Sequence, residues 1–164
     1  MPNGSNVQWC KHYPDGDEIK PNGVGGDISQ FIPVVAMNLG DIVFFSGGND
    51  SVTKGILPSA YNGMAGVVVG GDLTQDFIAE DAQMASNTIL QVCTAGKRVL
   101  VQMSGIAWVM SGAVAVAGGV PVTVDGATAG RVSITGAVSG VIVGTTINAS
   151  AAGATRQKMF VCPR

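Results

Sequence analysis

The chain has 164 residues, a formal net charge of −2 and 46% hydrophobic residues, while charged residues make up only 12%. This length suffices for one domain with a real core and gives no reason to expect two, and the hydrophobic share argues against a disordered protein. A phosphate-binding face needs clustered lysine and arginine, so nine scattered basic residues give no electrostatic reason to expect a nucleic-acid partner.

Residues 1–32 are rich in turn signals such as Pro21-Asn22-Gly23, so we expect an irregular N-terminal arm ahead of a β-rich domain over residues 33–164. Terminal segments are ordered only where something ties them down. Apolar anchors within the arm could therefore be seated in a groove of the same chain or of a neighbouring subunit. The anchors that we expect to make such contacts are Trp9, Tyr13 and Ile19.

The first ten residues, MPNGSNVQWC, have neither the basic start nor the apolar centre of a secretory signal. We therefore expect synthesis and folding in a reducing cytoplasm. Cys10, Cys93 and Cys162 are then expected to be free thiols, because three cysteines cannot all pair within one chain. Their wide spacing matches no zinc pattern, which needs close pairs of ligands.

Two apolar strands are expected between Ile32 and Phe45, joined around Asn38-Leu39-Gly40-Asp41 as the first hairpin of the core. The valine-rich run 63–71, GMAGVVVGG, is predicted to be a buried strand. A phosphate loop would need a spaced lysine followed by serine or threonine and then a helix, and this run has neither feature.

Residues 72–92 are the one stretch where a helical turn or two is expected, with Asp72 or Thr74 as the cap. Calcium loops need oxygen ligands at alternating spacing, a turn glycine and a closing glutamate, which this stretch does not supply. A solvated acidic face is the better interpretation. Its acidic residues are Asp72, Asp76, Glu80 and Asp81.

The stretch 97–125 is the centre of the predicted fold, because apolar side chains recur at every second position between glycines. A period of two predicts strands, and short ribbons with one apolar side must fold over one another into a small sandwich or barrel. No residue between Arg98 and Asp125 is charged, but the interspersed glycines and valines favour strands over a membrane-spanning helix. Trp108, which shares the parity of Ile106, is expected in the core.

The C-terminal third continues with short, glycine-bounded strands at 131–135, 140–144 and 145–147, after the turn Asp125-Gly126. This rhythm of one strand signal per 8 to 12 residues or so is typical of a sandwich or barrel. A last strand over 156–162 is expected to close the sheet. Its side chains alternate, with Gln157, Met159 and Val161 opposed to Arg156, Lys158 and Phe160.

No pattern in the chain points to catalysis. His12 is the single histidine and lies in the arm, which is a poor platform for an imidazole base. Nothing in the sequence joins it to Cys93 or Cys162 as a nucleophile pair, and Cys10 with His12 would supply only two metal ligands. We therefore expect no enzyme and no metal, cofactor or small-molecule substrate. An enzyme whose site escapes motif analysis stays as an alternative.

Residues 33–164 resemble the small β-rich decoration proteins, or cement proteins, of tailed-bacteriophage heads. The Gly-Asp-x-Val start of an early strand in that family appears as Gly40-Asp41-Ile42-Val43, and its glycine-valine strand appears as Gly66-Val67-Val68-Val69. The arm and the segment 72–92 are longer than the compact family pattern. Further matches are an Ala-Gly-x-x-Val-x-Val strand at 95–101, a glycine-led strand at 105–109, and the closing strand, small-residue loop and last strand at 142–144, 149–153 and 158–162.

The resemblance implies an all-β domain, a small β-sandwich or β-barrel-like fold of the β-tulip type, with a mechanical function. Such a protein would bind the exterior of the phage capsid, often as a homotrimer, and tie major capsid protein subunits together. It would have no nucleic-acid, membrane or small-molecule partner and would be made in the host cytoplasm. The arm residues Trp9, Tyr13 and Ile19 would then lie at a capsid or subunit interface.

A charge-poor surface agrees with this reading, because such a surface tends to be covered by a partner within an assembly. Two other readings stay open. The chain could be a different virion component, such as a head fibre base, a tail-tube protein or a receptor-binding module. A membrane-active phage protein that uses the uncharged runs is the less favoured reading.

Overall fold

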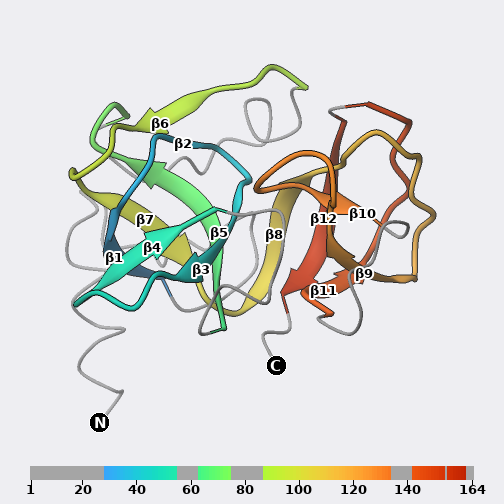
Figure 1. Ribbon diagram of the computed structural model, residues 1–164. Helices are drawn as coiled ribbons and strands as arrows, with labels where there is room; N and C mark the ends of the chain where they lie inside the picture. The colour runs from blue at the N-terminus through green and yellow to red at the C-terminus, as the bar shows by residue number, and fades with distance from the viewer. Residues whose placement is uncertain (1–27, 55–62, 75–86, 134–141, 154, 162–164) are drawn as a thin grey trace, which may run out of the picture.

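The computed structural model describes residues 28–54, 63–74, 87–133, 142–153 and 155–161. These residues form twelve strands and no helix, so the predicted all-β fold is confirmed. The strands build a closed barrel, a curled five-stranded sheet beside it and a two-stranded ribbon (Figure 1). Within the described ranges, no helix has the length and apolarity that crossing a membrane requires.

The barrel closes in the order β1-β4-β3-β5-β7. Strand β1 (Ile28–Pro33) pairs with β4 (Ser51–Thr53) in parallel and with β7 (Val99–Gln102) in antiparallel orientation. Strands β3 (Ile42–Phe45) and β5 (Met64–Gly71) complete the wall through antiparallel pairs. Because each strand has neighbours on both sides, the closed barrel leaves no free sheet edge.

One hydrophobic cluster fills the inside of the barrel. It needs a close approach of β5 to β7, and Gly66 permits that approach. A Cβ at Gly66 would overlap the carbonyl oxygen of Gln102, and φ there is +154°. The buried members of the cluster are Phe31, Met37, Leu39, Val43, Val52, Ala65, Val68, Val69, Val92, Cys93, Val99, Leu100 and Val101.

The second sheet runs in the order β10-β9-β11-β12-β8. Strand β12 (Arg156–Val161) lies between β8 (Gly105–Met110) and β11 (Gly144–Thr146). Strands β9 (Pro121–Val124) and β10 (Val132–Ser133) extend the sheet on the other side of β11. All four pairings are antiparallel.

A second hydrophobic cluster lies between the sheet and the barrel. Side chains that point out of the barrel wall, including Ile42, Phe44 and Val67, pack with Ala107 and Met159 on the inner face of the sheet. Neighbouring residues of β3 therefore serve different cores, since Val43 points into the barrel. Strand β5 also contributes side chains to both clusters, one on each side of the barrel wall. Every residue of β5 is therefore buried.

The hairpin predicted around residues 38–41 is wrong. Strand β2 (Met37–Asn38) pairs with β6 (Gln91–Cys93), and β3 turns back at 46–50 to pair with β4. The chain is diverted because the amide of Leu39 donates to the carbonyl of Leu90, and the amide of Gly40 donates to that of Val68. Partners distant in the sequence thus replace the expected local pairing.

The helical turn predicted within 72–92 falls largely on residues 75–86, which lie outside the described residues, so it stays a prediction. Residues 91–93 form β6. The carboxylate of Asp72 accepts hydrogen bonds from the backbone amide and the hydroxyl of Thr94. The hydroxyl of Thr74 bonds back to Gly71. The remaining acidic residues, Asp76, Glu80 and Asp81, lie outside the described residues.

The central stretch supplies strands as predicted, but it supplies them to both modules. Strand β7 belongs to the barrel, while β8 and β9 belong to the second sheet. The residues around Val116 are not a continuous strand and contribute a single bridge to Ser150. Strand β12, which was expected to close the sheet, lies in its interior.

Trp108 is only half-buried, which corrects its predicted place in the core. The inner face of β8 is formed by Ala107 and Val109, and Trp108 has the opposite parity. Its ring packs against the edge of the barrel cluster and lies 5.1 Å from the Lys158 ammonium, a cation–π contact.

Candidate functional site

The predicted interface residues Trp9, Tyr13 and Ile19 lie outside the described residues. Their assignment as contacts therefore stays a prediction. Cys10, His12 and Cys162 also lie outside the described part of the chain. The candidates among the described residues are the polar groups and surfaces of the barrel and the second sheet.

Cys93 on β6 is a free, buried thiol. Burial is the main cause that raises its pKa, to about 11. A thiol with this pKa carries almost no thiolate at neutral pH, and the thiolate is the reactive form. Cys93 therefore acts as a small core residue of the barrel rather than as a nucleophile.

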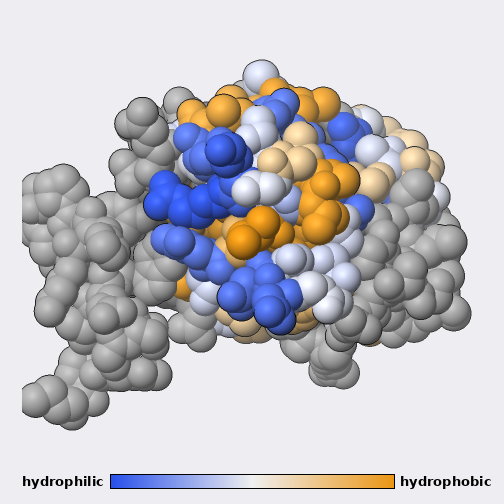
Figure 2. Space-filling view, turned by 60° about the vertical axis from the view of Figure 1, so that its left-hand side comes forward, coloured by the Kyte–Doolittle hydropathy of each residue, from blue (hydrophilic) through white to orange (hydrophobic). Residues whose placement is uncertain are grey.

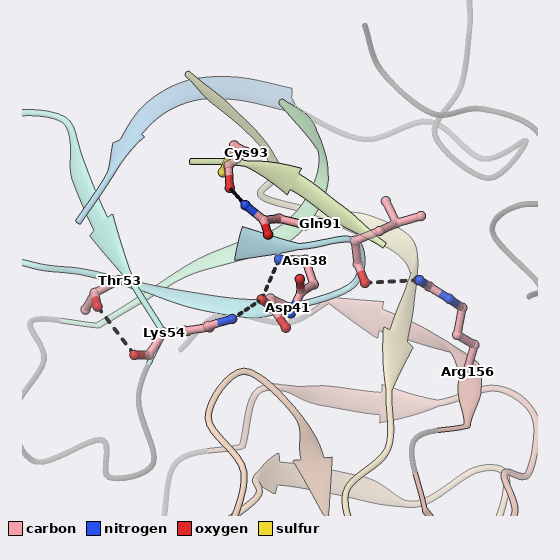
Figure 3. Close-up of polar contacts among 8 residues, drawn as sticks. Asn38, Asp41, Thr53, Lys54, Gln91, Cys93 and Arg156 are labelled. Carbon is pink, nitrogen blue, oxygen red and sulfur yellow. Dashed lines mark hydrogen bonds and ion pairs between the residues drawn. The ribbon is translucent and has the colours of Figure 1, made fainter. Parts of the chain in front are cut away.

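A charged pair joins Asp41, just before β3, to Lys54, just after β4 (Figure 3). The Lys54 ammonium lies 2.9 Å from Oδ2 of Asp41, and the amide of Asn38 donates to the same oxygen at 2.7 Å. Burial raises the pKa of Asp41 above its ordinary 3.8, and the positive charge of Lys54 opposes that shift. The pair and the Asn38 amide connect the segment that leads from β2 to β3 with the end of β4.

Arg156 connects the second sheet to the same segment (Figure 3). Its guanidinium donates to the carbonyl of Leu39 at 3.1 Å and to that of Thr88 at 3.2 Å, and its side chain is 4% exposed. Burial lowers the pKa of Arg156, while the charge of Asp41 raises it. Gly40 leaves the space for this contact, because a Cβ there would lie 3.0 Å from Nη1 of Arg156.

This polar junction, defined as Asn38, Asp41, Lys54 and Arg156, has little room for a ligand. The cavity beside it measures about 120 Å³ and is lined in part by Asp41, Lys54 and Arg131, which is space for a few water molecules. In the described ranges, no three His, Cys, Asp or Glu side chains come close enough to hold a metal ion. The junction therefore acts as a link between the two modules.

The outer face of the second sheet carries apolar side chains in one transverse row. The register places Phe160 between Ile106 of β8 and Thr145 of β11, and Thr145 is paired with Pro121 of β9. Their neighbours in sequence, such as Met159 and Val161, point to the core. Phe160 is 51% exposed even though its strand is central in the sheet.

A second row lies beside the first. The amide of Ile147 donates to the carbonyl of Lys158, and Lys158 is paired with Trp108. Ile147 is 48% exposed, and Lys158 is the one charged residue in the two rows. We call these two rows the sheet face; it consists of Ile106, Trp108, Pro121, Thr145, Ile147, Lys158 and Phe160.

The sheet face has the composition of a protein interface, in which aromatic residues are enriched and charges are scarce. A signal for it was present in the sequence, because the alternation in 156–162 sets Phe160 opposite Met159. That alternation could not tell which parity faces water. Comparisons with known proteins add no assignment, since no family model matches the chain and no curated protein matches it.

Proposed function

We propose that this chain is a structural virion protein that binds the outer surface of a phage head and stabilises contacts between major capsid protein subunits. The proposal joins the resemblance of residues 33–164 to phage decoration proteins with one structural observation. That observation is the sheet face, an apolar and nearly uncharged surface on a domain whose cores are already complete.

Apart from Trp108, whose ring packs against the barrel cluster, the residues of the sheet face belong to neither hydrophobic core. The barrel interior and the layer between the modules bury the large apolar side chains of both regions. Phe160 and Ile147 project from the opposite side of the sheet. A large aromatic side chain on an exposed face is a typical anchor of a protein interface, because it can be buried against a flat partner.

The fold suits a mechanical role. A closed barrel has no free edge, and the second sheet is held to it by a shared core and by Arg156. Force applied through the sheet face would therefore be carried into the barrel. Repetition of such a contact over a capsid lattice, or within a trimer, would convert a modest affinity into a strong constraint on the shell.

The test is co-sedimentation of the purified chain with expanded, undecorated phage heads. We expect saturable binding by the wild-type chain and roughly tenfold weaker binding by Phe160→Ser, as for a central interface anchor. Leu73→Ser is the matched control, because Leu73 is equally exposed, at 53%, but follows β5 of the barrel. It should bind as the wild type does.

Failure of the folded wild-type chain to bind heads would overturn the capsid assignment and would favour a fibre or tail component. Equal weakening by Phe160→Ser and Leu73→Ser would remove the sheet face as the contact. Circular dichroism of both variants establishes that they are folded, and light scattering of the free chain tests the expected trimer.

A further inference from the structure

A groove of about 470 Å³ lies beside β1, on the side of the barrel away from the second sheet (Figure 1). Among the described residues, no member of β1 belongs to the cluster between the barrel and the sheet. The groove is bordered by residues 30–32 of β1, by Asp50 before β4 and by the turn 96–98 before β7. Strand β1 is the middle one of these three neighbouring strands.

Apolar side chains project outward along the middle of this surface. Residues of β1 alternate between the barrel interior and solvent, with Phe31 inside. Ile32, and Val34 just after the strand, are 48% and 51% exposed, and Val35 is 39% exposed. Figure 2 shows this barrel side, with hydrophobic residues gathered in the middle of the view and hydrophilic residues beside them. An apolar centre with a polar rim is the anatomy of a binding surface.

The two flanks of this surface carry opposite charges. Asp50 directly precedes β4 on one side of β1, and Lys97 lies two residues before β7 on the other side. Both side chains are exposed, and neither has an ion-pair partner within the described ranges. Arg98 already takes part in another interaction, so the charge balance rests on Asp50 and Lys97. We call this surface the barrel face; it consists of Ile32, Val34, Val35, Asp50 and Lys97.

We propose that the barrel face binds the barrel face of a second copy of the chain across a two-fold axis. In a two-fold contact the same patch is used by both copies and must be complementary to itself. An axis that runs along β1 exchanges the two flanks, so Lys97 of each copy faces Asp50 of the other. The apolar side chains of the two copies then cover one another at the centre.

The charges select the direction of the axis. An axis that runs across β1 would set Asp50 against Asp50 and Lys97 against Lys97, and like charges that face each other suppress binding. Along β1, the register puts Asp50 and Lys97 about two positions apart, or roughly 7 Å, which a lysine side chain spans. Sheets that pack face to face align their strands to within about 30°, which agrees with an axis along β1.

A second copy is the occupant whose charges the barrel face matches. A partner with charges of one sign would be attracted at one flank and repelled at the other. Strand β1 is already paired with β4 and β7, so side chains make the contact rather than an added strand. Three outward apolar side chains form a small centre, and we therefore expect weak, reversible association. The contact leaves the sheet face free to bind a shell or to form a trimer.

The test is sedimentation equilibrium of the full chain and of two charge reversals, Lys97→Glu and Asp50→Lys. Either change alone sets like charges against each other at both flanks, so self-association should weaken by roughly tenfold or more. An equal mixture of the two variants restores both attractions. The introduced glutamate of one chain faces the introduced lysine of the other, and the unchanged Lys97 and Asp50 face each other. The mixture should associate at least as tightly as the wild type.

The apolar centre is tested in the same way. Ile32→Ser should weaken self-association severalfold, while Leu73→Ser, at an equally exposed position after β5, should leave it unchanged. Circular dichroism establishes that each variant is folded. Association through the sheet face, including a trimer, would respond to Phe160→Ser rather than to the charge reversals.

Three results would overturn the proposal. The first is self-association that both charge reversals leave unchanged. The second is a mixture of the two folded variants that associates no better than either variant alone. The third is a wild-type chain that sediments as a monomer at concentrations up to about 1 mM, which would leave the barrel face to a different partner. None of these results depends on phage heads, so the capsid assignment stands or falls separately.

Discussion

The barrel and the second sheet both bury one apolar side of their strands, but they do so in different ways. The barrel closes on itself, so its backbone pairs are internal and its interior is a core. The sheet stays open, covers one side of the barrel with its inner face and leaves its outer face to solvent. A sheet that stays open can bury its inner face only against a neighbouring module. Its outer face is then free to bind a partner.

The two regions are held together by different forces. Apolar side chains of the barrel wall and the sheet pack together in one cluster, and one guanidinium adds directional bonds across the boundary.

The largest effect is expected from Gly66→Ala, which should prevent the barrel from closing. A Cβ at this position would overlap the Gln102 carbonyl, so one of the two strands must move. We expect a loss of about 4 kcal/mol or more in the free energy of unfolding, measured by urea denaturation. The matched control is Gly96→Ala, where the Cβ would meet open space and only φ of +74° is unfavourable, at about 1 to 2 kcal/mol. Equal losses would mean that closure does not depend on this close approach.

The next largest effect is expected from Arg156→Met, which uncouples the sheet from the segment before β3. The variant keeps a long apolar side chain but leaves the carbonyls of Leu39 and Thr88 without these donors. We expect a loss of about 3 kcal/mol in the free energy of unfolding. Lys158→Met, two positions along the same strand, should cost about 1 kcal/mol or less. Similar losses for both variants would contradict the special role of Arg156.

A smaller, pH-dependent effect is expected at Asp41. Its pKa in the folded protein lies above the ordinary 3.8 because of burial. The protonated carboxyl therefore contributes to stability, and this contribution is fully present below pH 3.8. It is lost as the pH rises through the folded-state pKa and the carboxyl ionises. The stability of Asp41→Asn relative to wild type should therefore improve as the pH rises through this window, as measured by urea unfolding at several pH values. A relative stability that falls instead would show that the ion pair with Lys54 outweighs burial.

The smallest effect on stability is expected on the sheet face. Phe160→Ala should lower the free energy of unfolding by about 1 kcal/mol or less, because half of its side chain is already in water. Phe44→Ala removes the same group from the layer between barrel and sheet, where the ring is 1% exposed, and should cost about 3 to 5 kcal/mol. Thermal or urea unfolding of the pair would sharpen the comparison. A large loss for Phe160→Ala would show that the sheet face is part of the core.

Local alternation and glycine placement predicted much of the strand content. The run 63–71 is the buried strand β5, and the period of two after Lys97 corresponds to β7, β8 and β9. These predictions succeed because side-chain direction in an extended chain depends only on neighbouring residues. The polar turns between them likewise follow from residue type.

Pairing was not predictable in the same way. The stretch 32–45 has the local appearance of a hairpin, yet β2 pairs with β6 across more than fifty residues, and β1 pairs in parallel with β4. Two strands with the same alternation of apolar and polar residues are equally good pairing partners as far as the local sequence shows. The choice was made by the Leu39 and Gly40 hydrogen bonds to Leu90 and Val68, which exist only once the barrel has closed.

The sequence by itself determined that this chain is all-β, poor in charge, and built from short ribbons each with one apolar side, because those properties are carried by composition and by a period of two. Only the tertiary structure decided which apolar side would be covered. Met159 and Phe160 are adjacent, yet one is fully buried and the other half exposed, because the barrel wall packs on the face of the sheet that carries Met159. Arg156 is buried for the same reason: its partner Leu39 lies 117 residues away along the chain, a separation that no local pattern encodes.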